Sequence, residues 1–404
     1  MKYLDSEKIR KEFPFIVKNK ESKLIYFDNA ATTHKPQAVL SSIANYYTYT
    51  NSNTHRSSHV QGVSSTEKYE QARQTIADFI GANTAEIIFT SGATDSINLV
   101  ANSYVQNIIN QGDGILTTEI EHHSNFLPWQ KICKTKGGEL KMISFDENFK
   151  IRVSEDQLIK ERIKFIAIHH VSNVTACIQD VKKIIKLAKK LDIPILIDGS
   201  QAASHLKINV KDLDCDFYCF SGHKLFGPTG TGILYAKDEK IRKFLPNKLG
   251  GGMVSHASVK NSVWERAPLL LEAGTPNICG SIALADAVKY ILKLGLDNIY
   301  KHENMLAACT IDVLKRIPNI TLYRCSESSI PIFSFNINGI HHYDIASLLA
   351  ENKISVRSGH LCCQPLMQKL NINGCLRASL SIYNTVDEIE QFGKSLLKIV
   401  KFLT

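Results

Sequence analysis

Short runs of apolar residues alternate with longer amphipathic segments through the first 290 residues of the chain. Each run spans four to six residues, which is typical of a buried β-strand. Helical patterns lie between the runs, from Ser91 to about Ile109 and from Val181 to Leu191. This alternation predicts an α/β fold whose large domain is a mostly parallel sheet with helices on both faces. The predicted strands are Glu86–Thr90, Ile115–Thr118, Leu140–Phe145, Phe165–His170 and Ile193–Ile197.

The pattern changes near residue 291. A long helical segment, Asp297–Ile317, is followed by shorter strand-like runs at Ile332–Asn336 and Leu376–Ile382. Thr385 and Glu388 have the spacing of a capping box, which predicts the start of a final helix. We therefore expect a large domain over residues 25–290 and a smaller α+β domain made of residues 1–24 and 291–404.

Composition narrows the class of protein. With 404 residues, 44% apolar and 22% charged, the chain is typical of a globular protein with a large core. The net charge of +9 is modest and dispersed, which argues against binding to nucleic acid or a membrane surface. No apolar run reaches about 18 residues, and the N-terminus carries acids rather than a hydrophobic leader. Ten cysteines without a leader predict reduced thiols in the cytoplasm.

A lysine and an aspartate follow two of the apolar runs. Lys224 lies in Ser221-Gly222-His223-Lys224, just after the strand-like segment Asp216–Phe220. A lysine held at the end of a buried strand loses solvation, which favours the free amine that a Schiff base requires. Asp198 ends the Ile193–Ile197 run, and a carboxylate there can keep the pyridine nitrogen of pyridoxal phosphate protonated. The pair is typical of a fold-type I pyridoxal-phosphate enzyme.

Ala93 and Thr94 open a helix directly after a strand. Backbone N–H groups and the helix dipole at this point can hold a phosphate, although an ordinary capped helix without a ligand has the same pattern. Ser221 and His223 can add donors to the same phosphate.

Three more polar residues follow predicted strands or lie just beyond them. Gln201 can reach the phenolic oxygen of the cofactor ring, and Asn173 can hydrogen-bond the same oxygen. His122 can stack on the pyridine face. A lone histidine is more often a structural residue, but here the other positions predict the same ligand.

A second chemistry is predicted in the loop Val356–Pro365, where Cys362 and Cys363 are adjacent. Arg357 and His360 are cationic or can become so, and such neighbours favour the nucleophilic thiolate. The alternative is a pair of buried, unreactive cysteines. A metal site is not expected, because the cysteine spacing gives no paired C-x₂-C set.

Several motifs together resemble the class V aminotransferase family, and more narrowly its group II cysteine desulfurases of the SufS type. The similarity runs nearly from end to end, from Lys8–Pro14 to Tyr383–Thr385. The motifs are SGHKLFGPTG with GILY, DGSQA, EHHSNFLPW and RSGHLCCQPLM.

The resemblance implies a homodimer that uses pyridoxal phosphate to take sulfur from L-cysteine, releasing L-alanine and leaving a persulfide on a loop cysteine. It also implies sulfur delivery to a SufE-like acceptor for iron–sulfur cluster assembly, and some activity on L-selenocysteine. By motif alignment the catalytic thiol is Cys362, and Cys363 fills a position that usually holds a small residue. Leu361 replaces a residue that is commonly histidine.

The resemblance also assigns residues to the substrate and to the dimer. Arg377 matches the arginine that binds the substrate carboxylate, and the segment His55-Arg56 matches one near the substrate. Arg357 and Asn173 are also expected to bind the substrate, and His122 is expected to act in catalysis with Lys224 and Cys362. Thr275 matches a residue that contacts the phosphate in the partner subunit.

The residues leave other activities open. One is a different pyridoxal-phosphate reaction on the same fold, such as a selenocysteine-dominated lyase, a kynureninase or an aminotransferase. Another is a thiol-rich scaffold that carries sulfur without catalysis. The Cys362 loop argues against a kynureninase or an aminotransferase, and Lys224 with Asp198 argues against a scaffold.

Overall fold

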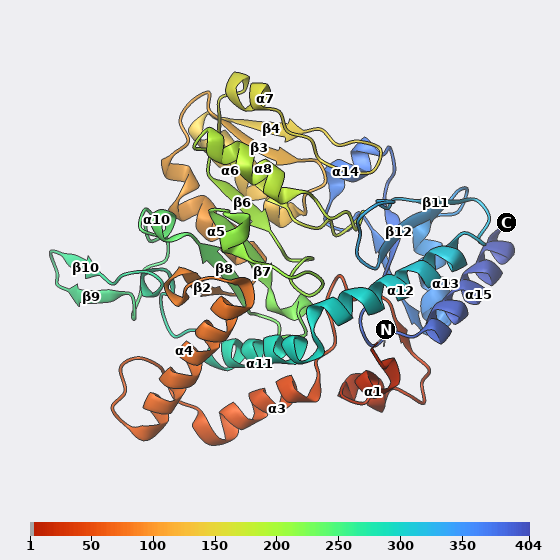
Figure 1. The fold of residues 1–404 in the computed structure, drawn as a ribbon, viewed down its shortest axis with the longest axis horizontal. Coiled ribbons are helices and arrows are strands. Elements are labelled where there is room, and N and C mark those ends of the chain that lie inside the picture. The colour runs from red at the N-terminus through yellow and green to blue at the C-terminus, as the bar shows by residue number, and fades with distance from the viewer. Residues whose placement is uncertain (1–3) are drawn as a thin grey trace.

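A computed structural model describes residues 4–404 and has a large sheet at its centre (Figure 1). Within these residues the sheet has seven strands in the order β2-β8-β7-β6-β5-β3-β4. β8 runs antiparallel to its neighbours β2 and β7, and the other pairs are parallel. This confirms the predicted mostly parallel sheet. The strands are β2 Ile87–Thr90, β3 Gly114–Thr118, β4 Glu139–Ile143, β5 Ile163–His169, β6 Ile195–Asp198, β7 Phe217–Ser221 and β8 Gly232–Ala236.

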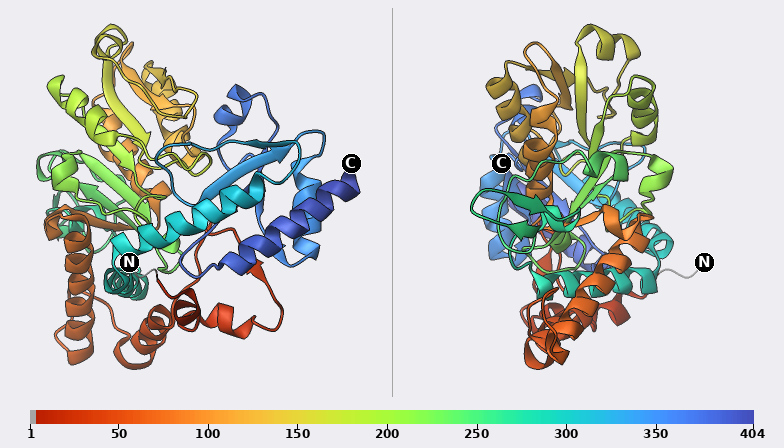
Figure 2. Two further views of the ribbon diagram at one scale, coloured as in Figure 1. Left: turned by 45° about the vertical axis from the view of Figure 1, so that its right-hand side comes forward. Right: turned by 90° about the vertical axis from the view of Figure 1, so that its left-hand side faces the viewer.

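Both faces of this sheet are buried, as continuous apolar runs require. In β5, Ile166 and Ile168 belong to the core on one face, and Phe165 and Ala167 belong to the core on the other. Helices pack on the two faces and at one end of the sheet (Figures 1 and 2). These helices are α3 Gln37–Asn45, α4 Val60–Ile80, α5 Ala93–Ser103, α6 Leu127–Lys136, α7 Glu155–Lys160, α8 Val181–Lys190, α9 Val210–Leu213, α10 Asp238–Ile241 and α11 Ile278–Leu294.

A second sheet lies toward the C-terminus, with the strand order β11-β12-β15-β14 and antiparallel pairing. Its strands are β11 Ile320–Leu322, β12 Ile332–Ile337, β14 Arg357–Gly359 and β15 Cys375–Ser379. The predicted strand Leu376–Ile382 therefore ends at Ser379. The helices in this region are α12 Leu296–Leu314, α13 His342–Glu351, α14 Gln364–Lys369 and α15 Val386–Leu403.

The N-terminal segment packs on this C-terminal sheet. β1 (Ile25–Tyr26) pairs in parallel with β13 (Ile354–Ser355), and Phe27 joins the core formed by Phe335 and Phe392. Two short helices precede it, α1 Ser6–Arg10 and α2 Pro14–Lys18. The division into domains at residues 24 and 290 stays a prediction, and the first three residues of its 1–24 segment lie outside the described residues.

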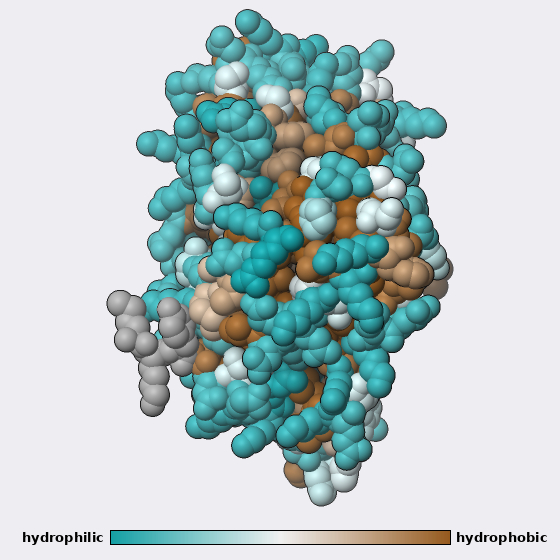
Figure 3. Space-filling model, turned by 90° about the vertical axis from the view of Figure 1, so that its right-hand side faces the viewer, coloured by the Kyte–Doolittle hydropathy of each residue, from teal (hydrophilic) through white to brown (hydrophobic). Residues whose placement is uncertain are grey.

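The capping box predicted at the last helix is confirmed. Thr385 accepts a hydrogen bond from the Glu388 N–H, and Glu388 accepts one from the Thr385 N–H. α15 then packs along α12 on the C-terminal side of the molecule (Figure 2). On that side, hydrophobic residues form an uneven band between hydrophilic ones (Figure 3).

A hairpin of β9 (Val254–Ala257) and β10 (Ser262–Trp264) projects from the opposite side of the molecule (Figure 1). Among residues 4–404, no helix is both long enough and apolar enough to cross a membrane.

Candidate active site

A cavity of about 480 Å³ lies beyond the carboxyl ends of β5, β6 and β7. Ligands of open parallel sheets bind at this edge, because the loops that follow the strands converge there. We call the side formed by residues that follow the large-sheet strands, together with the start of α5, the sheet wall. The opposite side is the loop wall, formed by residues 357–362 and Arg377. The predicted residues that line the cavity are Ala93, Thr94, His122, Asn173, Asp198, Gln201, Ser221, His223, Lys224, Arg357, Cys362 and Arg377.

Lys224 and Asp198 lie on the sheet wall. β7 ends at Ser221, and the single 3₁₀ turn Gly222–Lys224 carries the lysine into the cavity. Burial lowers the pKa of Lys224, and the Asp198 carboxylate partly offsets this shift. Asp198 is buried at the end of β6, where its Oδ1 accepts a hydrogen bond from the Ser200 N–H at 2.9 Å.

The carbonyl oxygen of His223, in the peptide bond that joins His223 to Lys224, accepts several hydrogen bonds. Among the described residues, four donors surround the carbonyl oxygen of His223. They are the Thr33 N–H and Oγ1, both at 3.1 Å, Thr32 Oγ1 at 3.3 Å and Lys35 Nζ at 3.0 Å. Burial lowers the pKa of Lys35 to about 8. These contacts fix the backbone from which the Lys224 side chain extends.

The start of α5 supplies backbone donors to the same cavity. Ala93 is the first residue of the helix, and its N–H donates to Ser221 Oγ at 2.8 Å. Thr94 Oγ1 is 2.7 Å from Ser124 Oγ. An eleven-residue helix directs its positive dipole end into this part of the cavity, which suits a phosphate.

His122 is a neutral imidazole on the sheet wall. Burial lowers its pKa to about 3, and the positive charge of Lys224 adds to the shift. Its Nδ1 accepts a hydrogen bond from the Ser124 N–H at 3.1 Å, which fixes the ring. Gln201 donates from Nε2 to the carbonyl oxygen of Ala30 at 2.8 Å.

These residues fit pyridoxal phosphate. The helix start and Ser221 suit the phosphate, Lys224 offers the amine, and the neutral His122 ring offers a flat face. In the described part of the chain, the second Asp198 oxygen, Oδ2, accepts no hydrogen bond and is free for a pyridinium N–H. The donor set therefore matches each end of the cofactor.

The loop wall carries Cys362, which is the one exposed cysteine among the ten, all of which are described. The Cys362 carbonyl oxygen accepts from the His123 N–H at 2.7 Å, and the Leu361 carbonyl accepts from Asn173 Nδ2 at 2.9 Å. The Cys362 N–H donates to His360 Nδ1 at 3.1 Å. Leu361 and Cys362 both have left-handed backbone conformations, with φ of 53° and 54°.

Cys363 differs from its neighbour. Its side chain is fully buried, its Sγ is 3.8 Å from the carbonyl oxygen of Glu119, and burial raises its pKa. A thiol in this environment stays protonated and has no access to the cavity.

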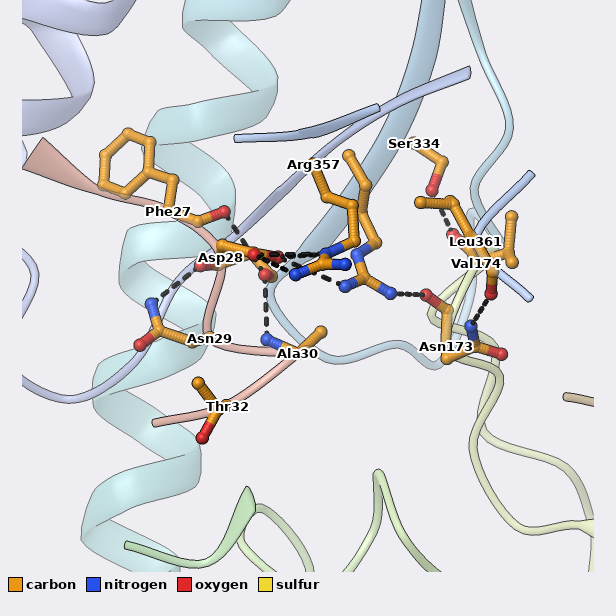
Figure 4. A network of polar contacts seen from close by, with 12 residues as sticks. Phe27, Asp28, Asn29, Ala30, Thr32, Asn173, Val174, Ser334, Arg357 and Leu361 are labelled. Atoms are coloured by element: carbon orange, nitrogen blue, oxygen red, sulfur yellow. Dashed lines mark hydrogen bonds and ion pairs between the residues drawn. The ribbon is translucent and has the colours of Figure 1, made fainter. Parts of the chain in front are cut away.

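Arg357 and Arg377 share the Asp28 carboxylate, and Figure 4 shows Arg357 beside Asp28. Asp28 accepts from Arg357 Nη2 at 2.8 Å and from Arg377 Nη2 at 3.3 Å. Arg377 Nη1 donates to the carbonyl oxygen of Asn173 at 3.0 Å, so the arginine also bridges the two walls.

Three predicted residues do not line this cavity. His55 lies 3.8 Å from Glu70, and Arg56 donates to the carbonyl of Val254 at 3.1 Å. Thr275 Oγ1 is 3.4 Å from Asn53 Nδ2. All three predicted residues are exposed, and their assigned roles stay predictions.

Sequence reasoning missed several residues near the cavity. Asp28 and Arg377 are 349 positions apart, and no sequence pattern connects them. Ser124 lies two positions after His122, and Ser200 lies two positions after Asp198. Their place on loops that follow predicted strands could have indicated that they lie at the cavity. The other missed lining residues are Ala30, Ala31, His169, Val171, Ser358 and Gly359. No group of three or more metal-ligating side chains occurs in residues 4–404.

Residues 25–392 match the family model of aminotransferase class V. The chain belongs to this family. That confirms the family resemblance and the fold-type I architecture, whereas the narrower SufS-type assignment stays a prediction.

Relatives that match this chain cover nearly all of its length. It is 40% identical over 402 residues to a probable cysteine desulfurase of Halalkalibacterium halodurans, covering 99% of each chain. The solved cysteine desulfurase of Thermococcus onnurineus is 37% identical, with a TM-score of 0.93 over 100% of this chain and 99% of that one. The cysteine desulfurase CsdA of Escherichia coli is 33% identical, with a TM-score of 0.90 and full coverage of both chains.

Proposed function

We propose that the protein is a pyridoxal-phosphate-dependent cysteine desulfurase that converts L-cysteine to L-alanine and keeps the sulfur as a persulfide on Cys362. One observation carries this proposal. A single cavity combines Lys224 and Asp198 of the sheet wall with the exposed thiol of Cys362 on the loop wall. A kynureninase or an aminotransferase has no use for such a thiol, and a scaffold has no use for the lysine and aspartate.

The cofactor would be held by residues of the sheet wall. Lys224, Asp198 and His122 would contact its reactive ring, with Gln201 and Asn173 beside the ring oxygen. When bound, pyridoxal phosphate supplies an electron sink for bond breaking at the substrate Cα. The phosphate would lie among Ala93, Thr94, Ser221, His223 and, in a homodimer, Thr275 of the second copy.

The chain's own residues then have separate tasks. Arg377 binds the substrate carboxylate and so orients the substrate between the two walls. The lowered pKa of Lys224 leaves its amine available to accept the Cα proton.

The Cys362 thiolate attacks the substrate sulfur. A sulfur–sulfur bond forms while the carbon–sulfur bond breaks, and the electrons of that bond remain on the carbon product. Protonation of this product gives alanine. The persulfide stays on Cys362 until a second thiol takes the outer sulfur.

Finer aspects of the function belong to the same proposal. We expect a SufE-like protein to accept the sulfur for iron–sulfur cluster assembly in the cytoplasm. We also expect activity on L-selenocysteine, because selenium leaves more readily than sulfur. The full-length similarity to named cysteine desulfurases supports the sulfur chemistry but does not distinguish these points.

The test is to incubate the purified holoenzyme with L-cysteine and a reductant, and to measure sulfide and alanine together. Equal amounts of the two products are expected. Pyruvate in place of alanine would indicate a β-eliminating lyase, and no product with a cofactor-free protein would favour a sulfur-carrying scaffold.

A further inference from the structure

Two arginines face each other directly across a pair of antiparallel strands at the cavity. Arg357 of β14 is the register partner of Arg377 of β15, and both side chains line the cavity. Like charges in directly opposed positions destabilise a sheet. Arg377 is only 3% exposed, whereas the Arg357 side chain is 49% exposed, so water screens the repulsion from the Arg357 side only. A counter-charge at the buried arginine therefore stabilises the arrangement.

Asp28 provides that counter-charge from a distant part of the chain (Figure 4). It follows β1 and is joined to the end of β15 by a bridge with Ser379. Its carboxylate accepts from Arg357 Nε at 3.1 Å to each oxygen and from Nη2 at 2.8 Å. Arg377 Nη2 donates to the same carboxylate at 3.3 Å. Asp28 thus holds both guanidinium groups in fixed positions.

The cluster keeps one unit of positive charge. Two guanidinium groups carry two positive charges, and the single Asp28 carboxylate cancels one of them. Arg377 Nε is buried and has no hydrogen-bond partner within residues 4–404. A donor without a partner and a remaining positive charge both suit one more acceptor that carries a single negative charge.

We propose that Asp28 is a positioning residue that sets the anion specificity of this cluster. By holding Arg357 and Arg377 and cancelling one of their charges, it makes the site prefer a monoanionic carboxylate to a dianionic group at the same place. The proposal rests on the proposed function, in which Arg377 binds the substrate carboxylate. Without Asp28, the two arginines would repel each other and would offer two charges to a ligand.

The test compares two ligands that differ at this one group. L-Alanine carries a carboxylate, and (1-aminoethyl)phosphonate at alkaline pH carries a doubly charged phosphonate. Binding of each to the holoenzyme is measured by titration calorimetry. The unmodified protein should bind L-alanine more tightly, and Asp28→Asn should reduce this preference by about tenfold or more.

Two further variants change the net charge of the Asp28, Arg357 and Arg377 cluster and test whether affinity changes with it. Arg357→Gln lowers the cluster charge to zero, so it should weaken both ligands and disfavour the phosphonate most. The double variant Asp28→Asn/Arg357→Gln restores a single positive charge and should bind L-alanine more tightly than Arg357→Gln alone. Asp146→Asn is the matched control, because Asp146 pairs with exposed Arg152 and lies outside the cavity. It should change neither affinity.

A folded Asp28→Asn variant that keeps the original preference would overturn the proposal. If that variant fails to fold, Arg357→Gln still decides, since an unchanged ratio of the two affinities would mean that the charge count does not set specificity. Alanine and sulfide production is measured with the same preparations, so that the role of Asp28 and the proposed function are tested separately. If the unmodified protein produces both and Asp28→Asn leaves the ratio of the two ligand affinities unchanged, only the role of Asp28 is rejected. If Asp28→Asn changes that ratio but the unmodified protein produces neither, only the proposed function is rejected.

Discussion

The two walls of the cavity are built in different ways. The sheet wall consists of residues placed directly after buried, mostly parallel strands, and burial there lowers the pKa of Lys224 and His122. The loop wall consists of short strands and an irregular loop, and its thiol is exposed. Polar contacts between distant segments hold the loop wall. One cavity therefore combines an amine that is shielded from water with a sulfur that is accessible to it.

The largest expected effect comes from the sheet wall. Lys224→Ala should abolish turnover, because within residues 4–404 no other lysine lines this cavity beside Asp198. Borohydride treatment followed by peptide mass spectrometry should find the cofactor attached at Lys224 in the unmodified protein and nowhere in the variant. Lys190→Ala is a comparison variant, since Lys190 pairs with Glu155 at the surface, lies outside the cavity and should leave attachment intact. Alanine production by the Lys224 variant would contradict the assignment.

Loss of the thiol on the loop wall should leave substrate binding at the sheet wall intact and should remove sulfur transfer. Cys362→Ser should still bind cysteine and change the cofactor absorbance, but alanine release should fall by about a hundredfold or more because no sulfur acceptor remains. Turnover of selenocysteine should be partly spared.

Cys363→Ser is the matched control for that variant. The buried Cys363 side chain has no access to the cavity, so this variant should stay largely active. Mass spectrometry after cysteine treatment should find a persulfide on Cys362. A persulfide on Cys363, with activity surviving in Cys362→Ser, would reverse the assignment.

Asp198→Asn should lose most activity but keep some cofactor. The neutral amide no longer favours a protonated ring nitrogen, and a reduction in kcat of about a hundredfold is expected. Spectral titration would show the residual cofactor. Near-normal kcat would remove Asp198 from this role and would weaken the electrostatic distinction between the walls.

Acid should destabilise the region around the sheet wall through three histidines, of which His122 and His223 line the cavity. Burial lowers the pKa of His170 and His223 from 6.5 to about 4, and that of His122 to about 3. The unfolded chain therefore binds protons near pH 6.5 while the folded chain does not, so stability falls as the pH decreases toward about 4. The melting temperature should decrease by roughly 5 °C over this interval.

The control for this pH effect is His170→Asn, which removes one of the three groups. Its melting temperature should depend less steeply on pH. A melting temperature that stays constant over the same interval in the unmodified protein would show that these histidines are not protected from protons.

The smallest effect is expected far from both walls. Thr385→Ala removes the side-chain cap of α15 and should lower the free energy of unfolding by about 1 kcal/mol. Denaturant unfolding measures this loss, and Thr385→Ser should restore most of it. Activity should not change. A large loss of activity would mean that α15 controls the position of the loop wall.

The difference between the sheet wall and the loop wall also explains which parts of the structure the sequence could predict. The runs Ile193–Ile197 and Asp216–Phe220 nearly match β6 and β7, because buried parallel strands are apolar throughout and end at polar residues. Asp198 and Lys224 could therefore be placed together from pattern alone.

The loop wall could not be placed in this way. Its geometry depends on Asp28, which no local pattern joins to Arg377, and on backbone hydrogen bonds to Leu361 and Cys362. Only family resemblance indicated Cys362 rather than Cys363. His55, Arg56 and Thr275, assigned by the same resemblance, remain outside the cavity of one chain.

The Cys362 loop has a consequence for how its sulfur can move. Leu361 is 6% exposed and packed in the core, while Cys362 beside it is exposed, and both hold a left-handed backbone that costs about 1 kcal/mol or more for each residue. Burial of the leucine, worth about 1.5–3 kcal/mol, offsets much of that cost. Because Leu361 is packed in the core, an outward movement of the backbone at this point would draw an apolar side chain into water. Sulfur delivery by such a movement would be a local opening of the fold, and its frequency would depend on how firmly one leucine is packed.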